Sequence, residues 1–316
     1  MTDAATQSLI AKLMLGYRGV AQSWECDLMG HLNVSHYFGR SSDHASFTRL
    51  NLGMAPRDMV ANHRGTVALE EHARFHKEVH AGGMMVGRSA PVEIGERTMT
   101  VYQEFRDSDD QLLTSFKTVI GHFDTANRKL VPWTDTTLEL AQAARIDLPN
   151  HAAPLHVPAG GRIKPPSLTE TQDAGFARTG GNTVNAWECD QFGHMNTMFY
   201  MRRQTEAVPH MWHSLGIDLS DMRDKQRGFV VGEICMSYVN EVLEGDIVET
   251  WSGVRELKEK TVLAEHRLYN TETGQLAATS LVRAVHFNLE TRRATAWDDD
   301  VYARIEANLP KTPDNK

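Results

Sequence analysis

Hydrophobic and polar positions predict one order of elements that occurs twice along the chain. Residues 15–25 are typical of a strand, and residues 33–52 are typical of a helix. In the later copy, apolar residues recur at near-helical spacing from Tyr200 to Leu215, so that helix has one apolar face to bury. Each copy therefore begins with a strand that leads into a long helix.

Extended segments separated by turn signals follow each helix. Short turns such as Ala81-Gly82-Gly83 between successive strands imply an antiparallel sheet. The expected strands are about 65–75, 83–95, 97–107 and 111–124, then about 228–239, 246–257, 261–270 and 275–288. Short helices at 136–146 and 300–308 close the copies. The pattern predicts an α+β fold in which each copy packs its long helix on a curved antiparallel sheet of about five strands.

The ends of the long helices carry their own signals. Asn33 and Asn196 are candidate N-caps, and Gly53 and Gly216 stand where the helices would end. Pro209 is expected to kink the second helix or relax it locally.

A direct sequence repeat supports the duplication. The motif WECDxxGHxNxxxY at 24–37 returns at 187–200, a shift of 163 residues (187 − 24 = 163). Matches continue downstream with the same shift and then, after one insertion, with a shift of 164. So long a period indicates a duplicated domain rather than a solenoid. We expect domains at 1–147 and 178–316, joined by a Pro- and Gly-rich linker at 148–177.

Composition narrows the class of protein. A length of 316 residues suits two domains, and a net charge of −8 argues against a nucleic-acid partner. No apolar run approaches the roughly 20 residues that span a bilayer, and the N-terminus lacks the features of a secretory signal. The cysteines (Cys26, Cys189 and Cys235) cannot form a disulfide framework. We expect a cytoplasmic protein with no membrane partner.

The repeated motif, followed by a helix and four extended segments, resembles that of the hotdog-fold acyl-CoA thioesterases, specifically the 4-hydroxybenzoyl-CoA thioesterase-like branch. The resemblance covers both copies, nearly the whole chain apart from the linker and termini. It implies tandem hotdog domains paired through their sheets as an internal pseudo-dimer, with each active site where one unit's helix N-terminus meets the other unit. It also implies acyl-CoA as substrate and no cofactor beyond the CoA moiety. Whether tandem chains form homo-oligomers stays open.

The resemblance places the catalytic carboxylate at Asp27 and Asp190, and the backbone N–H that polarises the thioester carbonyl at Val34 and Thr197. The residues at the start of each helix support the assignment of the backbone N–H independently of the resemblance. If the two asparagines cap their helices, the next N–H groups lie unsatisfied at the positive end of a macrodipole. Such a donor contributes roughly 3–4 kcal/mol in acyl-transfer enzymes. The aspartate would be the nucleophile or the general base, and the sequence does not distinguish them.

The motif residues also have structural interpretations. Either aspartate could be a loop or capping carboxylate. The histidine positions substrate or water, or it stabilises the Gly-His turn. The asparagine caps the helix, and the tyrosine forms a wall of the helix and pocket. These supporting residues are His31, Asn33, Tyr37, His194, Asn196 and Tyr200.

Two further carboxylate pairs recur in both copies. Asp43 and Glu206 fall inside the long helices, where a different hotdog branch places its catalytic carboxylate, so they are second-choice candidates; surface salt bridges are the alternative. Glu25 and Glu188 precede the aspartates by two positions and share their face if the strand is extended. They either raise the pKa of the aspartates or are solvated.

The sequence supports metal or thiol chemistry less well than it supports chemistry at the aspartates. Strand alternation points Cys26 and Cys189 away from the aspartates, which favours buried packing. Although there are 15 histidines, the copies share no His-x-x-x-His or Cys-x-x-Cys cluster, so we predict no metal.

Two rival functions belong to other classes. A hotdog-fold enoyl-thioester hydratase or dehydratase would carry a Gly-Asp-x-Asn-Pro-x-His loop or a His and Glu pair on the helix, and neither is present. A non-catalytic acyl-CoA binding protein could lose the aspartate, yet both copies retain it. The sequence does not identify the acyl chain of the substrate. It also does not distinguish CoA from acyl carrier protein as the acyl carrier, because that choice depends on surface residues such as Arg40, Arg64, Arg203 and Arg227. If only one site works, we favour Asp190.

Overall fold

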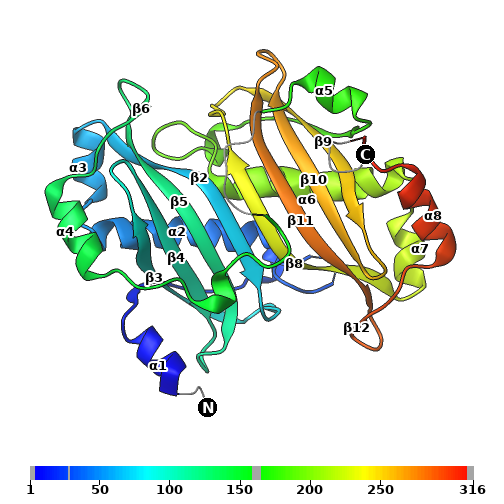
Figure 1. Cartoon of the computed structure of the whole chain (residues 1–316), viewed down its shortest axis with the longest axis horizontal. Coiled ribbons are helices and arrows are strands. Elements are labelled where there is room, and N and C mark those ends of the chain that lie inside the picture. The colour runs from blue at the N-terminus through cyan, green and yellow to red at the C-terminus, as the bar shows by residue number, and fades with distance from the viewer. Residues whose placement is uncertain (1–3, 28, 159–164, 312–316) are drawn as a thin grey trace. The chain divides into compact units, whose positions relative to one another are not determined.

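The chain divides into two compact units, Met1–Ala153 (unit 1) and Pro154–Lys316 (unit 2). This computed structural model describes residues 4–27, 29–158 and 165–311 (Figure 1). The boundary falls inside the segment interpreted as a linker. That segment is not uniformly irregular, because it contains a 3-10 turn, η2 (Asn150–Ala152), and a short helix, α5 (Leu168–Asp173).

Unit 1 packs the long helix α2 (Val34–Asn51) against an antiparallel sheet, which it contacts at β1 and β3 (Figure 1). The strand order is β1-β3-β4-β5-β2, and β6 pairs with β5. The strands are β1 (Met14–Val20), β2 (Arg64–Phe75), β3 (Met84–Ile94), β4 (Thr98–Arg106), β5 (Leu112–Asp124) and β6 (Lys129–Leu130).

Unit 2 repeats this arrangement with the long helix α6 (Thr197–Ser214) against β7 and β9. The strand order is β8-β11-β10-β9-β7, and β12 pairs with β11. The strands are β7 (Ala177–Thr183), β8 (Arg227–Tyr238), β9 (Ile247–Leu257), β10 (Thr261–Asn270), β11 (Leu276–Asn288) and β12 (Arg293–Ala294). The predicted α+β fold of each copy is therefore confirmed, and the pairing of the copies stays a prediction.

Short helices complete both units. The expected closing helices at 136–146 and 300–308 are confirmed as α4 (Asp135–Ala143) and α8 (Asp299–Ala307). The sequence pattern did not predict the others, which are α1 (Ala4–Ile10), α3 (Pro56–Ala61), α7 (Leu219–Asp224) and the α5 helix described above. Among the described residues, no helix has the length and apolar character needed to cross a bilayer.

The first strand ends earlier than predicted. β1 stops at Val20, and a 3-10 turn, η1 (Ser23–Glu25), replaces the last part of the expected strand. The cause is local, since the Glu25 carboxylate accepts a hydrogen bond from the Gln22 N–H at 2.8 Å and so offers the backbone an alternative to the ladder. Unit 2 has the same turn, η3 (Ala186–Glu188).

Both predicted helix caps are confirmed. The Asn33 side chain accepts from the N–H of Ser35 at 3.0 Å, and the Asn196 side chain accepts from the N–H of Met198 at 3.1 Å. Each cap satisfies the second amide of its helix and holds the entering chain extended.

The C-terminal ends also follow the sequence signals. Gly53 and Gly216 have φ values of 77° and 72°, the left-handed conformation that commonly ends a helix. α6 continues through Pro209 to Ser214 as one helix. Any relaxation at that proline is thus local and does not end the helix.

Each long helix makes a buried side-chain hydrogen bond to its sheet, but through different residues. In unit 1, Ser41 on α2 donates to Gln103 Oε1 at 2.6 Å within the buried interior. In unit 2, Gln204 Oε1 on α6 accepts from Ser280 Oγ on β11 at 2.6 Å, and Met211 and Trp212 of α6 join a hydrophobic cluster. The duplication has therefore preserved the fold while the side chains beneath the helix have diverged.

Candidate active site

A loop between the 3-10 turn and the long helix carries the repeated motif in each unit, and backbone hydrogen bonds close it. In unit 1, the Asn33 N–H donates to Glu25 O at 2.9 Å and the Asp27 N–H donates to His31 O at 2.8 Å. Gly30 lies inside this loop with a φ of 78°, a conformation that favours glycine. Unit 2 repeats these contacts and this glycine conformation. The closed loop keeps each aspartate beside the start of a long helix.

One oxygen of each aspartate anchors the loop. Oδ1 of Asp27 accepts from the N–H of Met29 at 2.8 Å and of His31 at 3.2 Å. Oδ1 of Asp190 accepts from the corresponding groups of Phe192 and His194 at 2.8 Å and 3.2 Å. Within the described ranges, Oδ2 of either aspartate makes no hydrogen bond. The second oxygen is therefore available to a reactant.

The helix N-terminus supplies donors in the same place. Each asparagine cap engages the second amide of its helix, so the first amide, at Val34 and at Thr197, has no intrahelical acceptor. Neither N–H donates to another group in the described part of the chain. Unit 2 adds the buried Thr197 hydroxyl, which also has no hydrogen-bond partner among the described residues. These groups are suited to an oxyanion.

Glu25, which is half-buried, and Glu188, which is buried, form ion pairs with the long helices, so the interpretation that they are merely solvated is wrong. Each carboxylate lies 2.6 Å from a guanidinium of the long helix, Arg40 or Arg203. Burial opposes ionisation of Glu188, but Arg203 and the Asn185 N–H outweigh it and hold its pKa below the usual value. Both arginines are buried, so the expectation that they lie on the surface is wrong.

The motif tyrosines are buried and pack against a second aromatic ring, and their role as pocket walls stays a prediction. Tyr37 meets the ring of Phe75 edge-to-face at 5.2 Å, and Tyr200 meets Tyr238 at 5.1 Å. Burial raises the pKa of both phenols, which stay protonated at neutral pH.

The cysteines are less buried than expected. Cys26 and Cys189 are half-buried, and their thiols donate to the carbonyls of Gln22 and Asn185 at 3.5 Å and 3.6 Å. Burial, followed by neighbouring carboxylates, raises the pKa of the Cys189 thiol. This environment disfavours a thiolate nucleophile.

The second-choice carboxylates lie on exposed helix surface. Asp43 is exposed on α2, and Glu206 is exposed on α6 in an ion pair with Arg202 at 2.9 Å. The Glu206 contact matches the surface salt bridge proposed as the alternative.

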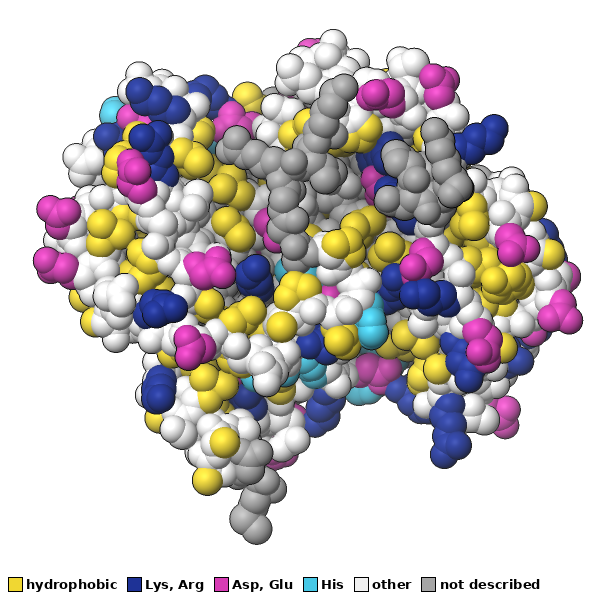
Figure 2. Space-filling model, in the orientation of Figure 1, with side chains coloured by type: hydrophobic (Ala, Val, Ile, Leu, Met, Phe, Trp, Pro, Cys, Tyr) yellow, Lys and Arg dark blue, Asp and Glu magenta, His cyan; other side chains and the backbone are white. Residues whose placement is uncertain are grey.

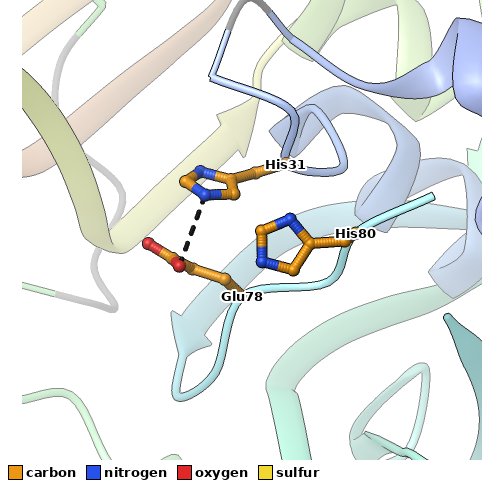
Figure 3. Close-up of side chains that lie close together, drawn as sticks. All are labelled: His31, Glu78 and His80. Carbon is orange, nitrogen blue, oxygen red and sulfur yellow. Dashed lines mark ion pairs between the residues drawn. The ribbon is translucent and has the colours of Figure 1, made fainter. Parts of the chain in front are cut away.

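The motif histidines turn toward glutamates that sequence reasoning missed. His31 Nε2 lies 3.3 Å from Glu78 Oε2, and His194 Nε2 lies 3.5 Å from Glu241 Oε1. The glutamates occupy matching positions in the repeat, which is the signal that could have identified them. In unit 1, His80 lies beside this pair (Figure 3). It has no counterpart, since unit 2 has Leu243 there.

The chain belongs to the thioesterase-like superfamily, whose family model matches residues 20–140 and 184–305. The two matched segments correspond to the two units, and the predicted tandem hotdog domains are confirmed. Membership in this family makes the chain a thioester hydrolase.

Individual relatives agree with this class. The betainyl-CoA thioesterase of Pseudomonas aeruginosa is 26% identical over 118 residues, which are 37% of this chain and 74% of that protein. A proposed oleoyl thioesterase from Lactobacillus plantarum has a similar structure, with a TM-score of 0.67 and 13% identity over 88% of this chain and 98% of that one. The 12:0-ACP thioesterase from Umbellularia californica has a TM-score of 0.66 and 14% identity, over 90% of this chain and 98% of that one. At these identities the structural similarity concerns the fold.

Proposed function

We propose that the chain hydrolyses acyl-CoA thioesters to a free acid and CoA, with Asp27 and Asp190 as nucleophile or general base. One observation carries the proposal. In both units an aspartate with one anchored and one available oxygen lies on a loop closed against the N-terminus of a long helix. That combination provides an attacking group and donors for an oxyanion.

In the general-base route, the available oxygen accepts a proton from water as the water oxygen attacks the thioester carbonyl carbon. The carbonyl oxygen becomes an oxyanion, which the N–H of Val34 or Thr197 stabilises. The intermediate then collapses, the C–S bond breaks, and the CoA thiolate leaves and takes up a proton. In the nucleophile route, the carboxylate forms a mixed anhydride as the C–S bond breaks, and water then hydrolyses the anhydride.

The unit 2 site has the stronger set of donors. Thr197 offers a buried hydroxyl in addition to its N–H, whereas Val34 offers the N–H alone. This difference supports the preference for Asp190 if the two sites are unequal.

The carrier is proposed from the relatives. The relative that aligns in sequence with part of this chain is a betainyl-CoA thioesterase, and this supports CoA over carrier protein. No cofactor is invoked, because the route uses only water, the carboxylate and backbone donors.

A thiol-release assay tests the proposal. The wild type and the Asp27→Asn and Asp190→Asn variants are assayed against short, long, aliphatic and aromatic acyl-CoAs, and against matching acyl carrier protein thioesters. We expect release from acyl-CoA, with a fall in at least one single variant. Glu206→Gln, which removes an exposed helical carboxylate, is the matched control and keeps full activity. Activity confined to carrier-protein substrates would refute the CoA assignment.

A further inference from the structure

Backbone pairing holds two loops of unit 1 together beside the motif. His31, ahead of α2, and His80, between β2 and β3, form an isolated antiparallel bridge. The Leu32 N–H also donates to Val79 O at 2.7 Å. The loops are therefore fixed relative to each other before any side chain is considered, and Glu78 lies on the second loop, directly before Val79.

Three side chains of these two loops converge. Figure 3 shows the rings of His31 and His80 and the carboxylate of Glu78 directed toward a common space. Each offers one ligand atom, and these atoms lie within 4.8 Å of one another. We propose that His31, Glu78 and His80 form a binding site for a divalent transition-metal cation, with Zn²⁺ as the best match.

The donor set fits this cation. Two imidazole nitrogens and one carboxylate oxygen are a three-ligand set used by zinc sites that keep a fourth position for water or substrate. At metal–ligand distances near 2.1 Å, tetrahedral geometry separates ligand atoms by about 3.4 Å. The widest separation must therefore shorten by at most about 1.4 Å (4.8 − 3.4 = 1.4). Side-chain rotation accommodates this change, since none of the three residues is fully buried.

A second contact orients one of the ligands. Nδ1 of His80 lies 3.1 Å from the carbonyl oxygen of Gly30, so the nitrogen donates there and Nε2 keeps its lone pair. Donation from the non-ligating nitrogen to a carbonyl is the usual outer-shell arrangement of metal-bound histidine. Gly30 belongs to the closed Asp27 loop, so a bound cation would tie that loop to the β2–β3 connection.

The site is specific to unit 1, which supplies an internal control. Unit 2 keeps the histidine and glutamate as His194 and Glu241, but Leu243 replaces the second histidine. Two ligands bind a cation far more weakly than three. The proposal departs from the sequence-based expectation of no metal, which considered only clusters shared by both copies. It does not depend on the proposed thioesterase activity.

The test measures metal binding directly on the full chain, purified without a polyhistidine tag and treated with chelator. ZnCl₂ is titrated calorimetrically, and CoCl₂ is titrated while visible d–d absorption is recorded. His80→Leu installs the unit 2 residue, Glu78→Gln removes the carboxylate charge, and His210→Leu removes an exposed histidine elsewhere. Leu243→His builds the missing ligand into unit 2.

We expect one equivalent of Zn²⁺ in the wild type and in His210→Leu. His80→Leu and Glu78→Gln should raise Kd by at least about 10-fold and abolish the Co²⁺ bands. Leu243→His should bind a second equivalent. Absence of stoichiometric Zn²⁺ binding in the wild type, or a His80→Leu Kd equal to that of the wild type, would overturn the proposal. Circular dichroism in chelator confirms that the variants are folded.

Discussion

A buried histidine in unit 2 makes the stability of that unit depend on pH. His266 on β10 is almost completely buried, and its Nδ1 shares a hydrogen bond with Ser252 Oγ at 2.7 Å. Ser252 is in turn bonded to Thr179 Oγ1 at 2.6 Å. Burial lowers the pKa of His266 to about 4. The folded unit therefore holds this imidazole neutral where an unfolded chain would protonate it.

The folded and unfolded pKa values of His266 decide whether acid raises or lowers the stability of the unit. The folded pKa of about 4 is below the reference value of about 6.5, so the unfolded chain binds more protons between these limits. The free energy of unfolding consequently falls as pH decreases through this window. The full difference corresponds to about 3.4 kcal/mol, of which about 2 kcal/mol is lost between pH 7 and pH 5.

The matched variant is His266→Gln, because the repeat places Gln103 at the corresponding buried position of unit 1. Glutamine keeps a hydrogen-bonding group and does not titrate. Urea unfolding is followed at pH 7 and pH 5 by tryptophan fluorescence, since four of the six tryptophans lie in unit 2.

We expect the wild type to lose about 2 kcal/mol more than His266→Gln between the two pH values. Other titrating groups are common to both proteins and cancel in this comparison. Equal losses in the two proteins would refute the reasoning, because His266 would then have the same proton affinity folded and unfolded.

Three further predictions concern the loop and helix of unit 2. Arg203→Met leaves the Glu188 carboxylate buried without its partner and should lower the free energy of unfolding by about 3–5 kcal/mol in urea titrations. Adding Glu188→Gln should restore most of the lost stability, because the buried charge is then removed. A loss below about 1 kcal/mol in Arg203→Met would contradict this prediction. Asn196→Ala should cost about 1 kcal/mol by the same measurement, and Asn196→Ser should cost less because it can still cap; equal costs would argue against the cap. Thr197→Val is tested in an Asp27→Asn background, in which only the unit 2 site is expected to work. The substitution should lower kcat by as much as roughly 100-fold and leave the free energy of unfolding unchanged. An unchanged kcat would exclude the Thr197 hydroxyl as a donor to the oxyanion.

The sequence predicted those parts of the fold that depend on repetition and local signals. The long helices, their asparagine caps and the glycines that follow them were all recognisable. The strand before the motif was predicted too long, because a side-chain contact of Glu25 decides where it ends. One missed feature was present in the sequence. Glu25 and Arg40 recur with the same spacing as Glu188 and Arg203, and that recurrence marks an ion pair.

The candidate site was predictable only where the copies agree. Asp27 and Asp190 stand out because both copies carry them, and the structure gives them the same contacts. His80 has no counterpart in the repeat, and it meets His31, 49 residues earlier (80 − 31 = 49), only because the two loops pair through their backbones. Sequence spacing does not reveal such a contact.

The most direct test of the central claim is the turnover number of the Asp27→Asn/Asp190→Asn double variant with the best acyl-CoA substrate of the wild type. Both substitutions keep the size of the side chain and an oxygen that can anchor the loop, so the fold should persist. We predict that thiol release falls to background while circular dichroism remains that of the wild type. A folded double variant that keeps most of the wild-type kcat would contradict the assignment of these aspartates.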